Sequence, residues 1–245
     1  MNDYGVAEAQ IFKGQARPAR ELGNLDLATD LLSKAISALE SFRAAIPNED
    51  LGPAEILWAR ELLDCYGSRG GVHRSAGRFA KSVTDYDETY KLESSNRFGF
   101  KDNASYALLQ RLVARVLLRP DLIGSDPWIV EGVNLLGAFE DAANKIERQS
   151  QRSGDKWYLA DRALVLLMLL KPEEEEAWEN FEYPEPTIFP IRSTLRTVTD
   201  LEESLRSVQS FVTNSRFQET YRRVSAAREL LTKLEQKTAK GRPPA

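Results

Sequence analysis

The sequence predicts an all-α fold, built as an array of antiparallel helix pairs. Apolar residues recur at steps of three and four along most of the chain, which is typical of one face of a helix. No stretch shows the alternation of β-branched residues that is typical of a strand. Two glycines, Gly23 and Gly77, interrupt the helical pattern where a short turn would return the chain.

The clearest helix pair lies between Pro53 and Glu93, with its turn at Gly77. The apolar stripe of its first helix consists of Leu57, Ala59, Leu62, Leu63, Tyr66 and Gly70. The second helix carries Phe79, Val83, Tyr86 and Tyr90. Because a glycine supplies the positive φ that ends a helix, we expect an αα-hairpin.

Small residues recur at fixed distances from both glycines. Gly70 lies seven residues before Gly77, and Ser82 follows it by five. The same offsets around Gly23 hold Ala16 and Ala28. A bulkier residue follows each glycine by nine positions, Tyr86 in one hairpin and Leu32 in the other. A smaller residue, Thr89 or Ala35, follows each glycine by twelve positions.

This order resembles the tetratricopeptide repeat (TPR), whose helix pairs need small residues where they cross. The resemblance implies an irregular TPR-like right-handed array of antiparallel helix pairs. Residues 1–93 match best and residues 94–239 are divergent. The two glycines lie 54 residues apart, whereas a regular array would separate them by about 34. We therefore expect one α-helical repeat domain over residues 1–239, followed by a disordered tail at 240–245.

The remaining elements follow from turn and capping signals. The first pair is expected over residues 5–22 and 25–43. Phe98 and Phe100 look buried within the loop after the central pair. Asp126 and Pro127 predict the start of a helix over 127–150. The segment after Asp155 is apolar nearly all round, so we expect that helix at the centre of the array. An acidic turn or short helix and two long helices, over about 191–212 and 216–237, complete the chain.

Composition limits the classes of function. The 245 residues include 33 basic and 37 acidic side chains, and the net charge is −4. Bulk charge therefore favours neither nucleic acid nor an anionic membrane as a partner. One Cys and one His exclude a disulfide framework and a multi-Cys/His zinc site, and they fit a reducing, cytoplasmic location. No apolar run reaches the roughly 20 residues of a membrane helix.

No residue pattern indicates catalysis, a cofactor or a metal, so we expect a protein that is not an enzyme. Cys65 and His73 lie eight residues apart, too far along a helix to pair directly. The glycines and arginines near residues 67–78 lack the GK[ST] ending of a phosphate-binding P-loop. The glutamates from Glu173 to Glu176 point around a helix rather than to one site.

The predicted partner-binding residues are polar side chains on helices that should line the concave face of the array. They are Tyr66, Arg69, Arg74, Asn103, Tyr106, Gln110, Arg111, Tyr158 and Asp161. Aromatic and Arg side chains are the usual anchors of protein interfaces. The alternative is that these groups satisfy each other between the helices, as buried polar groups must in any fold.

Two functions remain open. The first is a scaffold or regulatory adaptor that binds a protein or peptide, such as an effector enzyme, through a concave helical groove. The W-x-x-A-D-x-A spacing from Trp157 to Ala163 resembles repeat-like regulatory domains found beside signalling kinases and in bacterial defence or stress-signalling proteins. The second is a sensor that binds a phosphate-containing ligand or nucleic acid. Its candidate residues are Arg69, Arg74, Arg78, Lys81, Arg97 and Lys101.

Overall fold

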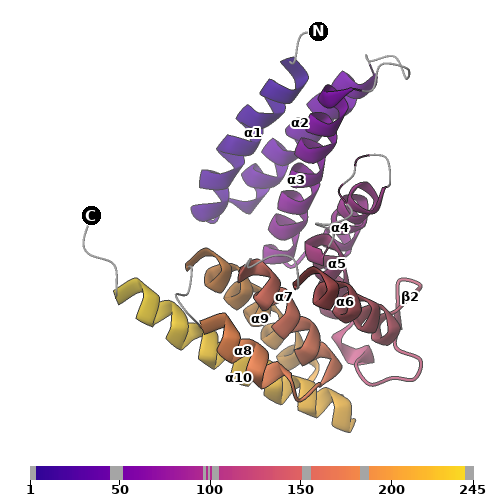
Figure 1. Cartoon of the computed structure of the whole chain (residues 1–245), viewed down its shortest axis with the longest axis vertical. Coiled ribbons are helices and arrows are strands. Elements are labelled where there is room, and N and C mark those ends of the chain that lie inside the picture. The colour runs from indigo at the N-terminus through magenta and orange to yellow at the C-terminus, as the bar shows by residue number, and fades with distance from the viewer. Residues whose placement is uncertain are drawn as a thin grey trace. The chain divides into compact units, whose positions relative to one another are not determined.

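The computed structural model describes residues 4–44, 52–95, 98, 100, 105–150, 156–182 and 188–240. Every long element in these ranges is an α-helix, so the all-α prediction is confirmed (Figure 1). The helices are α1 (Tyr4–Glu21), α2 (Leu25–Ala44), α3 (Pro53–Ser75), α4 (Phe79–Ser94), α5 (Ser105–Leu118), α6 (Leu135–Ser150), α7 (Lys156–Leu169), α8 (Glu174–Glu182), α9 (Ile188–Val208) and α10 (Ser215–Lys240). A short 3-10 helix, η2 (Pro120–Leu122), follows α5.

The chain divides into two compact units, residues 1–114 and residues 115–245. In unit 1, α1 packs on α2, α2 on α3 and α3 on α4, so consecutive helices form packed pairs (Figure 1). In unit 2, α6 packs on α7, α7 on α8 and α9 on α10. The single domain expected over 1–239 stays a prediction. Lys240 belongs to α10, and the rest of the predicted tail lies outside the described residues.

Both predicted glycine turns are confirmed. Gly77 has φ +68° and Gly23 has φ +77°. At Gly77 the glycine N–H donates to the Arg74 carbonyl at 3.0 Å, and the Arg78 N–H donates to the His73 carbonyl at 2.9 Å. This pair of bonds satisfies carbonyls that the end of α3 leaves without helical partners. An equivalent pair, at 3.0 and 2.8 Å, closes the turn after α1.

The small residues of the recurring pattern lie where the helices cross. The Ser82 hydroxyl of α4 donates to the Gly70 carbonyl of α3 at 2.9 Å. A Cβ atom at Gly70 would lie only 3.2 Å from the Tyr86 ring and 3.3 Å from Asp85 Cβ. The other small positions, Ala16, Ala28, Ala35 and Thr89, are buried. Their size therefore permits the close approach of neighbouring helices.

Trp58 of α3 anchors the apolar core between α1, α2 and α3. Its indole Nε1 donates to the Leu39 carbonyl of α2 at 2.8 Å. The Phe98 ring lies edge-on to Trp58, with centroids 6.2 Å apart, and stacks on Phe100 at 5.8 Å. Phe100 is buried and Phe98 partly buried, as the sequence predicted.

The prediction of a helix over 127–150 is wrong for its first turns. A two-stranded hairpin, β1 (Ile129–Val130) and β2 (Val133–Asn134), precedes α6. Its two turn residues, Glu131 and Gly132, have φ of 48° and 72°. Positive φ at both central residues is the geometry of a two-residue hairpin turn, which matches the twist of paired strands. Helical φ and ψ cannot continue through such a turn, so α6 begins only at Leu135.

Within unit 2, the largely apolar α7 takes the central place that its sequence predicted. It contacts α6, α8, α9 and α10. Its buried apolar residues include Ala163, Leu164, Val165, Leu167 and Met168. An all-round apolar helix needs neighbours on several sides, and these four helices supply them.

Replacing Gly77 with Val should destabilise the chain, because a β-branched residue is strained at φ +68°. We expect a loss of about 1–2 kcal/mol or more in the free energy of unfolding, measured in urea. Gly14→Ala is the matched control. Gly14 lies inside α1 with open space around it, so that change should be neutral or stabilise by up to about 1 kcal/mol. Equal effects of the two changes would contradict the turn geometry.

Candidate functional site

Arg69, a predicted partner-binding residue, forms an ion pair inside unit 1. Its Nη2 lies 2.7 Å from Oδ1 of Asp85, and its Nε lies 3.0 Å from Oδ2. Its Nη1 donates to the Ser33 hydroxyl at 3.1 Å. The Asp85 residue is 2% exposed. A bidentate guanidinium–carboxylate pair is among the stronger polar contacts in proteins, and this one joins α2, α3 and α4.

His73 lies beside the same carboxylate, with Nε2 at 3.7 Å from Asp85 Oδ2. Burial lowers the pKa of His73, and the nearby cations Arg78, Arg69 and Lys81 act in the same direction. The charge of Asp85 opposes this shift. The imidazole is therefore held mainly neutral near pH 7.

Arg74 and Gln110 are in contact with each other. The Arg74 guanidinium donates to Gln110 Oε1, which joins α3 to α5. Arg74 is 5% exposed and Gln110 is 6% exposed. The structure thus brings these two predicted residues together, but it leaves little of either side chain at the surface.

Tyr66 and Arg111 also contact side chains of unit 1. The Tyr66 hydroxyl donates to Glu40 Oε1 of α2 at 3.0 Å. Burial, together with this bond, raises the pKa of Tyr66 to about 12. Arg111 Nε lies 3.0 Å from Asp87 Oδ1. The Arg111 guanidinium also lies 4.4 Å from the centre of the Tyr90 ring, within cation–π range.

The other predicted partner-binding residues lie elsewhere. Asn103 is outside the described residues, and of Tyr106 only its place in α5 is described. Tyr158 and Asp161 are buried on α7, in unit 2. A partner-binding role for the predicted set stays a prediction.

Arg69 and Arg78, two of the six candidate residues of the alternative function, are paired with acidic groups. Arg78 Nη2 lies 3.0 Å from Oδ1 of Asp26, and Arg69 is held by Asp85. Lys81 is exposed, whereas Arg97 and Lys101 lie outside the described residues.

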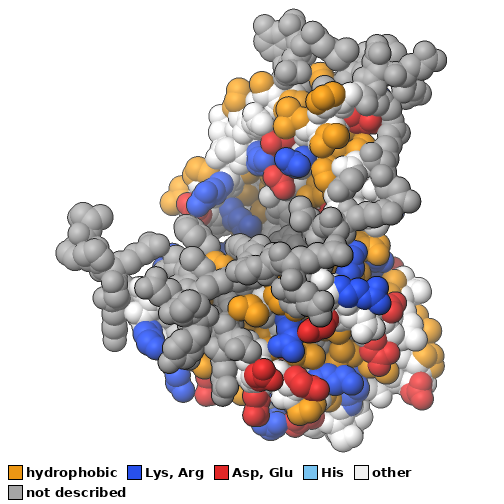
Figure 2. All heavy atoms as spheres, in the orientation of Figure 1, with side chains coloured by type: hydrophobic (Ala, Val, Ile, Leu, Met, Phe, Trp, Pro, Cys, Tyr) orange, Lys and Arg blue, Asp and Glu red, His pale blue; other side chains and the backbone are white. Residues whose placement is uncertain are grey.

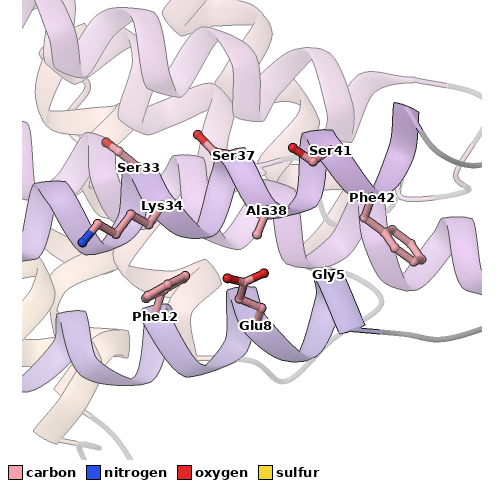
Figure 3. Close-up of a pocket in the computed structure, with 9 residues that line it drawn as sticks. All are labelled: Gly5, Glu8, Phe12, Ser33, Lys34, Ser37, Ala38, Ser41 and Phe42. Carbon is pink, nitrogen blue, oxygen red and sulfur yellow. The ribbon is translucent and has the colours of Figure 1, made fainter.

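A surface groove that the sequence analysis missed runs along α1 and α2 (Figure 3). Its volume is about 670 Å³. It is lined by Gly5, Glu8, Phe12, Ser33, Lys34, Ser37, Ala38, Ser41 and Phe42. Glu8 and Phe12 project from α1 toward Ala38 and Lys34 of α2 (Figure 3). The three serines, spaced four residues apart, are the signal in the sequence that could have marked this face.

The exposed residues of the groove project from a different side of α1 and α2 than the one that packs on α3. The buried apolar residues of these two helices that pack with α3 are Val6, Ala9, Ala35, Ile36 and Leu39. Among the groove residues, Phe12 and Phe42 also pack partly against this core, and Ser33 accepts a hydrogen bond from Arg69 of α3. Because successive residues turn by about 100° around a helix, Glu8 and Lys34 point to another side than the buried apolar residues. The groove is therefore open to solvent on its outer side, where Glu8, Lys34, Ser37 and Ser41 are exposed.

Apolar and charged groups share this outer face. Phe12 and Phe42 are half-buried, and Ile11, which lies beside Phe12 in α1 but does not line the groove, is 60% exposed. Figure 2 shows hydrophobic side chains among charged ones on the side of unit 1 that faces the viewer. Lys34 Nζ lies 6.0 Å from the centre of the Phe12 ring. Among the described residues, the Glu8 carboxylate has no ion-pair partner.

The described residues do not meet the requirements of a metal site, a reactive thiol or a membrane helix. No group of three or more His, Cys, Asp or Glu side chains among them could hold a metal ion. Burial raises the pKa of the Cys65 thiol to about 12, so the reactive thiolate is scarce at neutral pH. None of the helices in the described ranges has both the length and the apolar character to cross a membrane.

Comparisons with known proteins give no match: no family model, no curated protein and no solved structure matches this chain significantly.

The stability of the fold should depend on the protonation of His73, the chain's single histidine. Because its pKa is lowered from 6.5 in the folded state, the unfolded chain binds the proton more tightly. This contribution to stability is complete above pH about 6.5 and is lost as the pH falls through the lower folded-state value. We expect the melting temperature of the wild type to fall more between pH 7.5 and 5.5 than that of His73→Gln. If the melting temperatures of the two proteins fell equally over this pH range, His73 would not make the expected contribution to stability.

Proposed function

We propose that this protein is a non-enzymatic interaction scaffold or regulatory adaptor. It binds a partner protein or peptide through the outer groove of α1 and α2. One observation carries the proposal: a groove of about 670 Å³ at the surface, with half-buried aromatic rings and a row of serines along it. Rings that a partner can bury, beside polar groups that can orient it, are the usual composition of a protein interface.

The groove takes the place of the concave surface expected from the sequence. Most of the polar side chains of that predicted surface already contact other groups of the fold, as Arg69 does with Asp85. Breaking such a buried pair to bind a partner would cost about 3–5 kcal/mol. Glu8, Ser37 and Ser41 of the groove are exposed, so a partner can contact them without that cost.

The array itself supports a scaffold role. The recurring glycine turn and the small residues at the helix crossings favour a divergent TPR-like array, a class whose stacked helix pairs create extended binding surfaces. The free, buried Cys65 agrees with the reducing cytoplasm. The W-x-x-A-D-x-A spacing in α7 favours a regulatory context such as bacterial defence or stress signalling, and the effector enzyme would then be the partner. A phosphate-binding sensor is the weaker candidate, because Arg69 and Arg78 are paired with carboxylates.

Blocking the groove should release the partner without unfolding the protein. Ser37→Trp places a bulky ring at an exposed position of α2 that lines the groove. Ser207→Trp makes the same change at an exposed serine of α9. We expect a protein that co-purifies with the full-length chain from its native cells to be lost with Ser37→Trp and kept with Ser207→Trp. The affinity should fall by roughly thirtyfold or more, which corresponds to about 2 kcal/mol.

Both variants should melt like the wild type, since neither position is buried. A partner that stays bound to Ser37→Trp with unchanged affinity would contradict the groove as its binding site.

A further inference from the structure

We infer that the groove receives an amphipathic α-helix of the partner, with a basic side chain that pairs with Glu8 and apolar side chains that contact Phe12 and Phe42. This inference rests on the proposed function, since it names the partner for the same groove. The docked helix would continue the array of unit 1 by one element.

The packing of the neighbouring helices favours a helix as the ligand. Inside unit 1, α2 and α3 each pack on a neighbouring helix on either side. At the amino-terminal end, the outer face of α1 and α2 has no such neighbour among the described residues. A helix face that packs on nothing is usually polar. Here the groove instead has two half-buried phenylalanine rings, Phe12 and Phe42.

The walls of the groove favour a helix over an extended peptide. Both walls are helical, so apart from the first turn of α1 and the last turn of α2 their backbone N–H and C=O groups are already used in helical bonds. An extended chain would bring its own unpaired backbone groups and find mainly side chains to satisfy them. A helix satisfies its backbone internally, and laying an amphipathic helix into a groove is an established mode of recognition.

The charges along the groove define the residues of the bound helix. Glu8 lies opposite Ala38, at the middle of the groove, and its carboxylate has no ion-pair partner among the described residues (Figure 3). A Lys or Arg of the partner fits this position. Lys34 lies one helical turn further along, opposite Phe12 (Figure 3). An acidic residue four positions from the basic one would meet it, because four residues span about one turn.

The length of the contact follows from the lining residues. Gly5 and Phe12 mark the two ends of the groove on α1. Seven residues at about 1.5 Å each span about 10 Å, or two turns of a partner helix. The partner segment that fits the groove is therefore a helix of two to three turns, with one basic residue between apolar residues.

The test selects helical peptides on the full-length protein. The probe is a displayed library of 21-residue peptides with a fixed Ala-rich helical frame and random residues on one face. The wild type should enrich peptides with a Lys or Arg flanked by apolar residues at steps of three and four. Circular dichroism should show that the isolated peptides gain helix on binding.

Reversing the charge at Glu8 gives the decisive comparison. With Glu8→Lys, the peptides selected on the wild type should bind at least tenfold more weakly, and exchanging their basic residue for Glu should restore binding. Glu8→Gln, which removes the charge and keeps the shape, should give an intermediate loss. The inference is overturned if no helical peptide is enriched, or if charge reversal leaves the affinities unchanged.

The outcomes separate this inference from the proposed function. If Ser37→Trp releases the native partner and the library yields no helix, the groove is a binding site for another kind of segment. If selected helices bind the groove and Ser37→Trp keeps the native partner, the inferred ligand stands and the proposed function fails.

Discussion

The buried carboxylate of Asp85 is the constraint on which unit 1 depends. It is 2% exposed, and an ionised group can occupy such a place only if other groups compensate its charge. Arg69 supplies two bonds to it and one to Ser33, and His73 lies beside it. The requirement fixes α2, α3 and α4 against one another, since each helix contributes a member of the group.

The polar groups of unit 1 fall into two sets, those bonded inside the fold and those exposed at the groove. Arg74 and Gln110 bond to each other out of solvent, and Tyr66 is held by Glu40. On the outer face of α1 and α2, Glu8 and the serines Ser37 and Ser41 line an open groove. Polar residues of these helices thus differ in contacts and exposure according to the side from which they project.

The sequence predicts features that depend on local geometry. The turns at Gly23 and Gly77 are visible because positive φ favours one residue type. The bond between Arg69 and Asp85 links residues 16 positions apart on two helices, and no periodicity marks such a pair. The groove depends on how α1 and α2 lie side by side. The sequence does not predict the hairpin before α6, because its turn residue Glu131 has φ 48° and a glutamate gives no signal for positive φ.

A double-mutant cycle at Arg69 and Asp85 tests most directly whether these polar groups hold the fold together. The free energy of unfolding in urea is measured for wild type, Arg69→Met, Asp85→Asn and the double variant. Each single change should cost about 3 kcal/mol or more, because it leaves a buried charge without its partner. The double variant should lose at least about 1 kcal/mol less than the sum of the two. Additive losses, each near zero, would show that the pair does not hold the helices together and would contradict this account.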